Sequence, residues 1–187
     1  MAAELTVLAE GYADDRVASS VVLVRDGDTI IVVDPGMVAK RSVILDPLES
    51  LGISPDAVTD IVLSHHHPDH TLNAALFPAA RVHDFQAIYS GDIWEERRAE
   101  GFRLSPSAWL LETPGHTPQD VTTLVETGSG LIACTHLWWD ADGPDEDPFA
   151  PDRAVLRSSR ERILALEPIL IVPGHGAGFV PSDGTPR

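Results

Sequence analysis

Apolar residues in this chain come in short runs bounded by glycine, proline and acidic residues, a pattern typical of buried β-strands. Three runs near the amino terminus, at 5–9, 17–25 and 29–34, predict a β-meander, with Asp26-Gly27-Asp28 as the hairpin turn between the last two. Further strands are predicted at 60–63, 80–84, 108–113, 121–126, 131–135 and 169–172.

Segments with helical character separate these strands. Helices are predicted at 41–51, ended by Gly52, at 71–77 and at 153–166, and a short turn or helix at 55–59. Each predicted sheet is apolar on both faces, so one face must pack against the other sheet and the other face under a helix. The order of strands and helices therefore predicts an α/β fold, a four-layer αββα sandwich. The length of 187 residues predicts a single domain, 1–187.

The charge is strongly acidic, with 29 acidic residues against 13 basic ones, a formal net charge of −16 and Lys40 as the one lysine. Such a surface repels polyanions, which makes nucleic acid an unlikely partner. Dense arginines occur at Arg97-Arg98 and within 153–162, and the second set reads more simply as an exposed helix face with charges of both signs.

The single cysteine, Cys134, excludes an intrachain disulfide and fits a reducing compartment. The first residues lack a basic segment followed by an apolar stretch, and no apolar run approaches the length of a membrane span. We therefore expect a cytoplasmic protein with no membrane partner, and the sequence leaves a homodimer open.

Five potential metal ligands lie within His65-His66-His67-Pro68-Asp69-His70, directly after the apolar run 61–63. Pro68 disfavours helical backbone at His67, so the segment is predicted to be a strand-to-helix turn. His65 and His67, two apart in extended backbone, project from one face toward one cation, whereas His66 points away. Asp69 and His70 then face a second cation.

Three more histidines end apolar, strand-like runs: His116 and His175 follow Pro-Gly, and His136 follows Cys134-Thr135. Packing gives no reason for this recurrence, but the ends of strands commonly converge on a site. Imidazole nitrogen and carboxylate oxygen are ligands that zinc accepts. We predict a metal site, with two zinc ions as the expected cofactors and iron or manganese as other options.

The order His-x-His-x-Asp-His at residues 65–70 resembles the signature of the metallo-β-lactamase superfamily. Short stretches such as 8–12, 76–78 and 159–163 are similar to one subgroup, the metallo-β-lactamase domain-containing proteins. The resemblance implies the αββα fold and a dinuclear hydrolase. It also implies that one metal is held by His65, His67 and His116, and the other by Asp69, His70 and His175.

Position 136 departs from that family pattern, because most hydrolases of the superfamily carry Gly-Asp where this chain has Thr135-His136. The family's aspartate bridges both metals, but a neutral imidazole offers one lone pair at a time. His136 is expected either to ligate the second metal or to donate a hydrogen bond nearby, and we favour ligation.

The expected chemistry is hydrolysis, because a metal lowers the pKa of bound water and polarises the bond under attack. Asp69 is the predicted catalytic residue, orienting the nucleophile. A small ester, thioester, lactone or amide is the expected substrate. Three alternatives stay open: a nuclease or phosphodiesterase, a mononuclear iron oxygenase, and a noncatalytic metal-binding or ligand-sensing protein.

Several nearby residues are candidates for other roles. Trp138, Trp139 and His83 are the candidate substrate-binding residues, although a tryptophan in the core or a structural histidine would look the same in sequence. Adjacent strand residues face opposite ways, so only one of the two tryptophans can line a site. Asp34, at the end of an earlier strand, is predicted to brace a ligand histidine.

Overall fold

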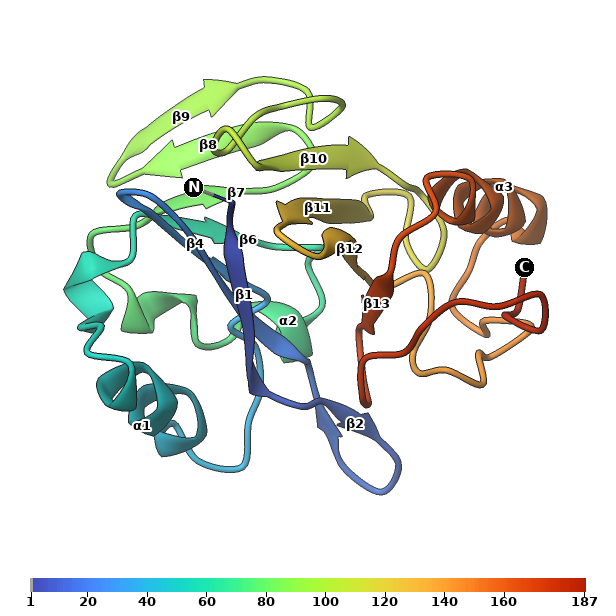
Figure 1. The fold of residues 1–187 in the computed structure, drawn as a ribbon, viewed down its shortest axis with the longest axis horizontal. Coiled ribbons are helices and arrows are strands. Elements are labelled where there is room, and N and C mark those ends of the chain that lie inside the picture. Colours follow the sequence, from blue (N-terminus) through green and yellow to red (C-terminus); the bar gives the residue numbers. More distant parts are fainter. Residues whose placement is uncertain (1) are drawn as a thin grey trace.

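The computed structural model describes residues 2–187, so Met1, the first residue of the predicted domain, lies outside the described residues. The larger sheet has seven strands in the order β1 (Glu4–Ala9), β4 (Val21–Asp26), β5 (Thr29–Val33), β6 (Asp60–Val62), β7 (Arg81–His83), β8 (Ala87–Ser90) and β9 (Ile93–Glu96). The smaller has four in the order β10 (Ala108–Glu112), β11 (Val121–Thr127), β12 (Gly130–Thr135) and β13 (Leu170–Pro173). A two-stranded hairpin, β2 (Tyr12–Ala13) with β3 (Val17–Ala18), projects from this body (Figure 1).

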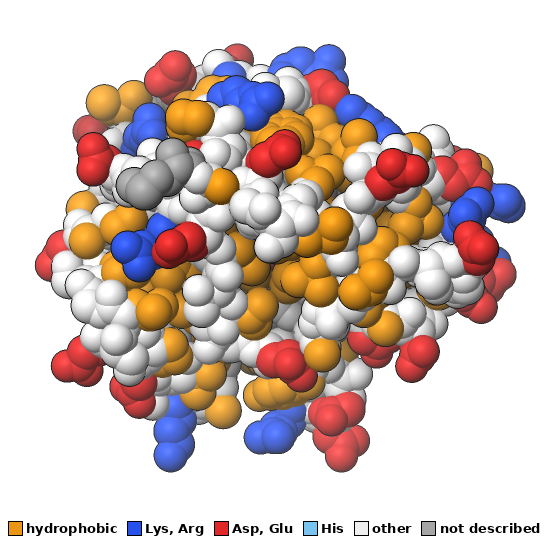
Figure 2. Space-filling model, in the orientation of Figure 1, with side chains coloured by type: hydrophobic (Ala, Val, Ile, Leu, Met, Phe, Trp, Pro, Cys, Tyr) orange, Lys and Arg blue, Asp and Glu red, His pale blue; other side chains and the backbone are white. Residues whose placement is uncertain are grey.

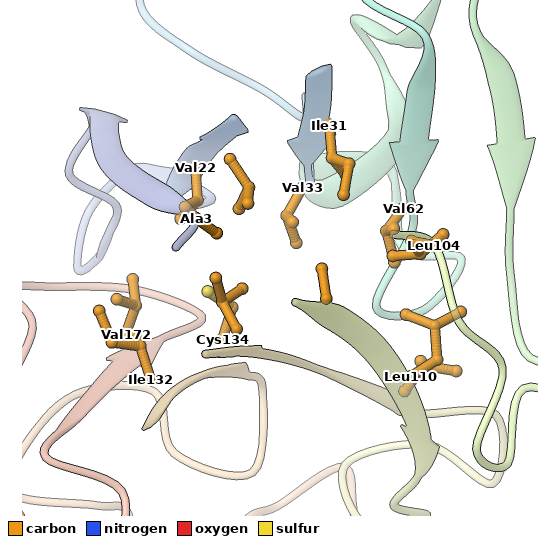
Figure 3. Packing of buried hydrophobic residues seen from close by; sticks show 14 of the residues in the cluster. Ala3, Val22, Ile31, Val33, Val62, Leu104, Leu110, Ile132, Cys134 and Val172 are labelled. Carbon is orange, nitrogen blue, oxygen red and sulfur yellow. The ribbon is translucent and has the colours of Figure 1, made fainter. Parts of the chain in front are cut away.

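Alternating residues of the central strands divide between two hydrophobic cores. In β4, Val22 and Val24 belong to the core between the sheets, whereas Val21 and Leu23 belong to the core under α1 (Ser42–Ser50). Side chains alternate between the faces of a strand, so an uninterrupted apolar run marks a sheet that is covered on both sides. Figure 3 shows side chains of the two sheets facing each other across the first core.

The outer faces of both sheets are covered by helices. Ile44 and Leu48 of α1 pack against the larger sheet, and Leu156 and Ile163 of α3 (Arg153–Leu164) pack against the smaller one. The two helices lie on opposite sides of the molecule (Figure 1). The order helix, sheet, sheet, helix confirms the predicted four-layer sandwich. None of the described helices is long and apolar enough to cross a membrane.

The predicted helix at 71–77 is wrong. The chain instead forms α2 (Pro68–Thr71), then a separate 3-10 turn, η2 (Ala74–Leu76), whereas the short turn or helix predicted at 55–59 is confirmed as another 3-10 turn, η1 (Pro55–Ala57). The break is at Asn73, whose side chain donates to the Gly36 carbonyl at 2.6 Å and accepts from Arg41 at 3.2 Å. These contacts tie the chain to the loop after β5 and stop the helix.

Residues 89–107 include the second half of β8 and all of β9, at the outer edge of the larger sheet, and then lead to β10. Cys134 lies in the core between the sheets, where burial raises the pKa of its thiol to about 12. It is therefore an inert packing residue.

A fully buried arginine fixes the loop between β12 and α3. Arg160 donates to the carbonyls of Leu137, Pro144 and Asp145 at 2.8, 2.7 and 3.3 Å. We expect Arg160→Met to lower the free energy of unfolding by about 2–4 kcal/mol, because it leaves these carbonyls without a donor. Urea denaturation measures the change.

The matched control is on the same helix. Arg157 is exposed and pairs with Glu161, so Arg157→Met is expected to cost less than about 1 kcal/mol. Equal losses in the two variants would contradict the role given to Arg160.

Candidate metal centre

The histidine-rich segment runs from the end of β6 into α2. His67 precedes the helix with extended backbone, φ −65° and ψ 144°, and Pro68 is the first helical residue, as the sequence predicts. His65 and His70 are buried, and the Asp69 carboxylate is partly exposed. His66 points away, as predicted, and contacts Asp84 at 3.0 Å.

The other histidines reach the same place because β12 and β13 are parallel, so their carboxyl ends lie together. His136 follows β12 and His175 follows β13, and their Nε2 atoms are 3.2 Å apart. Gly174 permits this approach, since a Cβ there would lie 2.4 Å from the His136 ring. His116 enters from the loop after β10.

Two groups of donor atoms result. The Nδ1 of His67 lies 3.0 Å from Nε2 of His65 and 3.1 Å from Nε2 of His116. The Oδ2 of Asp69 lies 3.3 Å from Nε2 of His70 and 3.7 Å from Nε2 of His175. These are the two sets that the family resemblance implies.

His136 lies between these sets. One of its donor atoms is within 4.8 Å of donors from His65 and His116, and the same holds for His70 and His175. Its ring stacks on that of His116, with centroids 4.2 Å apart. The structure thus places this imidazole where it can reach either cation position.

Three of the six rings are oriented by an acceptor on the side away from the centre. Nδ1 of His70 donates to Asp34 at 2.8 Å, Nδ1 of His116 to Asp147 at 2.7 Å and Nδ1 of His175 to the Ala18 carbonyl at 2.8 Å. Each bond holds a ring proton on Nδ1, so that in the neutral form of the ring the Nε2 lone pair faces the centre.

Asp34 contacts His70 as predicted, and its backbone is strained. Its φ of 50° is unusual for a residue other than glycine. The conformation is held by three bonds: its carboxylate accepts from Ser64 N at 2.7 Å and from His70, and its carbonyl accepts from Ser19 Oγ at 2.9 Å. The strain is consistent with a residue fixed for a task at the site.

The environment of the centre shifts the pKa values of its donors in different directions. Burial, with the surrounding imidazoles, lowers the pKa of His65 and His136 far below the usual range, so both rings are neutral at pH 7. Burial also opposes the charged forms of Asp69 and His70, but the contact between these two side chains outweighs it. For His70, the contact with Asp34 adds to this effect. The pKa of Asp69 is lowered to about 2 and that of His70 raised to about 9.

These shifts predict how the metal-free protein responds to pH. The unfolded chain binds protons on His65 and His136 near pH 6.5, whereas the folded protein does not, so stability falls as the pH drops from about 7 to 5. His70 has the opposite sign, because its raised pKa gives stability that is present below pH 6.5 and lost toward pH 9. Urea midpoints measured in chelator should therefore be highest near neutral pH. A midpoint that is highest at pH 5 would contradict these assignments.

The donor set fits divalent metals. Among the described residues, Nε2 of His70 and Nδ1 of His136 are buried with no hydrogen-bond partner, which is costly unless another group satisfies them. The nitrogen separations of 3.0 and 3.1 Å suit two ligands of one tetrahedral ion, whose bonds of about 2.0–2.1 Å place them roughly 3.3 Å apart. Imidazole with one carboxylate is a donor set that zinc and iron share.

The centre is at the floor of a pocket of about 410 Å³. Trp139 and Phe149 form one wall, their rings at 28° and 6.0 Å between centroids. Trp138 is fully buried in the core under α3, so its predicted contact with substrate is corrected; the chain places the two tryptophans on opposite sides. His83 is also fully buried, bonded to Asp60 at 2.7 Å, and cannot touch a substrate. No residue of 89–107 lines this pocket.

Sequence reasoning missed Asp147, which joins the pocket wall to a metal ligand. Its carboxylate accepts from Nδ1 of His116 at 2.7 Å, from Nε1 of Trp139 at 2.9 Å and from the Phe149 amide at 2.9 Å. The acidic loop 143–148 contains three neighbouring carboxylates, and nothing in their spacing distinguishes this one. Asp147 lies directly behind the pocket wall that Trp139 and Phe149 form.

We expect Asp147→Asn to weaken metal binding about 10–100-fold, the usual effect of losing a carboxylate behind a ligand histidine. In the wild type, one carboxylate oxygen accepts from both His116 and Trp139. The uncharged amide oxygen of asparagine is a weaker acceptor for these two bonds. Competition with a chromogenic chelator measures the affinity. Asp145→Asn, an exposed neighbour, is the control, and equal affinities in the two variants would refute the role of Asp147.

Comparisons with known proteins agree with this geometry. Residues 14–175 match the family model described as Metallo-beta-lactamase superfamily. A curated relative named Metallo-beta-lactamase domain-containing protein 1 from Xenopus laevis is 31% identical over 92% of this chain and 79% of its own length. Its human namesake is 36% identical over 80% of this chain, which spans 59% of that protein.

Solved structures share the fold at low identity. A candidate metallo-beta-lactamase from Thermotoga maritima superposes with a TM-score of 0.76 at 20% identity, covering 97% of this chain and 100% of that one. A quorum-quenching N-acyl homoserine lactone hydrolase gives 0.69 at 20% identity over 93% and 91%. TTHA1623 in a di-iron-bound form gives 0.69 at 23% over 92% and 94%.

Proposed function

Because this chain belongs to the metallo-beta-lactamase superfamily of enzymes, we propose that it is a hydrolase of a small ester, thioester, lactone or amide that uses two divalent metal ions, zinc in the first instance. The observation that carries the proposal is the convergence of six histidines and Asp69 on one centre, of which His67, Asp69, His116, His136 and His175 line the pocket. A purely structural site would be closed, whereas this one opens into a cavity large enough for a small ligand.

The two donor groups divide the ligands. His65, His67 and His116 would hold one ion; Asp69, His70 and His175 would hold the other. We assign His136 as a further ligand, because its buried Nδ1 has no partner among the described residues and its ring contacts both groups.

When bound, such ions supply an activated water and polarise the carbonyl under attack. The protein contributes orientation and exclusion of solvent. Asp69, ionised at neutral pH because its pKa is about 2, can accept a hydrogen bond from the attacking water and turn its lone pair toward the carbonyl. Trp139 and Phe149 cover the apolar part of the substrate and keep bulk water from it.

The arginines give nucleic acid no continuous track. Arg98 pairs with Glu112, Arg153 with Glu146 and Arg162 with Glu100. Arg97 bonds to the Asp84 carbonyl and borders a shallow depression of about 570 Å³ that acidic side chains also line. Figure 2 shows Lys and Arg side chains at separate places around one face, interspersed with acidic ones. With a net charge of −16, these pairs support a small substrate over a polyanion.

A panel of chromogenic substrates tests the proposal: an aryl ester, a thioester, a lactone, a β-lactam and a phosphodiester, each with metal-loaded and chelator-treated protein. We expect at least one of the first four to be hydrolysed, with loss of turnover on chelation and recovery on adding zinc. Turnover of the phosphodiester alone would favour the nuclease alternative, and no metal-dependent turnover at all would favour a noncatalytic role.

A further inference from the structure

The hairpin β2–β3 gives the pocket an acidic rim. Ala13, Asp14 and Val17 of this hairpin line the pocket together with Trp139 and Phe149. We propose, on the basis of the hydrolase function above, that Asp14 selects substrates by the charge at the end remote from the scissile bond: tails that are apolar and neutral or cationic are accepted, and anionic tails are rejected.

The walls favour an apolar tail. Above the metal ligands, the pocket is lined by the small or branched side chains of the hairpin and by the stacked rings of Trp139 and Phe149. Phe149 is 60% exposed and lies 5.3 Å from the His116 ring, so it extends the wall from the centre toward solvent. Covering the hydrocarbon part of a substrate with such a surface removes apolar area from water and so favours binding.

Apart from the proposed metal ions, the charged side chains near this wall are acidic and have no basic partner in the pocket lining. Among the residues that line the pocket in the described chain, none is lysine or arginine. Of the two acids there, Asp69 is among the proposed metal ligands, whereas the Asp14 carboxylate accepts from the Arg16 amide at 3.0 Å and forms no ion pair within the described residues. The Arg16 guanidinium instead stacks over Tyr12, 5.3 Å from the ring centroid, and Tyr12 does not line the pocket.

The hairpin is fixed relative to the centre at its base. Ser20 N donates to the Gly174 carbonyl and Gly176 N to the Gly11 carbonyl, each at 2.8 Å, on either side of His175. Gly11 allows this contact, because a Cβ there would lie 2.6 Å from Ser20 N. The hairpin that carries Asp14 is therefore bonded to the loop that carries His175. These bonds hold the Asp14 carboxylate at a defined place over the pocket.

The experiment compares three aryl esters that differ only at the end of a six-carbon acyl chain: a methyl group, a carboxylate or a trimethylammonium group. In the wild-type protein we expect kcat/KM to be roughly fivefold lower for the carboxylate ester than for the methyl ester, as for two like charges about 4 Å apart that stay fully hydrated. The trimethylammonium ester should match or exceed the methyl ester. Asp14→Asn, which keeps an oxygen for the Arg16 amide, should bring the three values together, and Asp14→Lys should reverse the order.

Asp15→Asn is the matched control, because Asp15 is the exposed neighbour on the same hairpin and does not line the pocket. A wild-type protein that accepts the carboxylate ester as well as the methyl ester would overturn the proposal, and so would a preference that Asp14→Asn leaves unchanged. If none of the esters is cleaved, the hydrolase function fails on its own. The charge preference is then decided by the affinities of the same uncleaved esters, read from tryptophan fluorescence in the wild type and Asp14→Asn.

Discussion

Replacing Asp69 with asparagine is expected to lower kcat/KM by about a thousandfold, within the range found when a positioned acid or base is removed. The amide keeps the shape of the carboxylate but loses its charge. In the wild type this charge is stabilised by the contact with His70, which outweighs burial and lowers the pKa of Asp69 to about 2. The same change removes the only carboxylate from the second donor group. The variant should therefore also bind its second metal more weakly. Steady-state kinetics and metal content measured on one preparation check both parts.

The control for this variant is Asp142→Asn, an exposed carboxylate on the loop after β12, which should stay within twofold of the wild type. Asp69→Asn protein that retains more than a tenth of the wild-type kcat/KM would contradict the role given to Asp69. Loss of activity together with loss of cooperative unfolding would indicate a folding defect instead, so urea denaturation of both variants accompanies the kinetics.

Gly36→Ala is expected to disrupt the centre through the backbone alone. A Cβ at this position would lie 1.5 Å from the Asp69 carbonyl oxygen and 2.6 Å from the Cα of His70, so the loop after β5 and the start of α2 cannot both keep their places. The overlap is with main-chain atoms, which no side-chain rotation relieves. We expect destabilisation by about 3 kcal/mol and loss of metal from the position that contains Asp69 and His70.

Gly128→Ala tests whether the effect is specific to this contact. Its Cβ would meet only Ala2, at 3.9 Å, and stability and metal content should stay close to those of the wild type. Gly36→Ala protein that binds the same amount of metal as Gly128→Ala, with the same urea midpoint, would show that the close approach of the two loops is not required.

Much of the fold follows from the apolar runs. Val21 to Val24 alternate between two cores, and such a run can be buried only in a sheet covered on both faces. The helices at 42–50 and 153–164 were also predicted closely, because each has an apolar stripe and a definite end. The helix at 71–77 could not be excluded from sequence, since its end depends on bonds from Asn73 to Gly36 and Arg41, more than 30 positions away.

The site, like the fold, could be predicted from the sequence only in part. The histidines and Asp69 could be identified because their residue types and their places after strands are unusual in a core, and the structure brings them together. The parts that tertiary contacts decide were not accessible: which tryptophan faces the pocket, which acid of the loop 143–148 holds His116, and that the hairpin puts Asp14 over the cavity. None of these choices changes the local pattern of the sequence.

Metal content per chain tests the central claim most directly. Protein purified without chelator, exchanged into metal-free buffer and titrated with zinc should bind two equivalents, determined by elemental analysis and native mass spectrometry. The His65→Ala and His175→Ala variants should each bind one, since they remove donors from different groups. A wild-type protein saturated by a single equivalent, or one that binds none, would contradict the dinuclear centre on which the proposed hydrolysis depends.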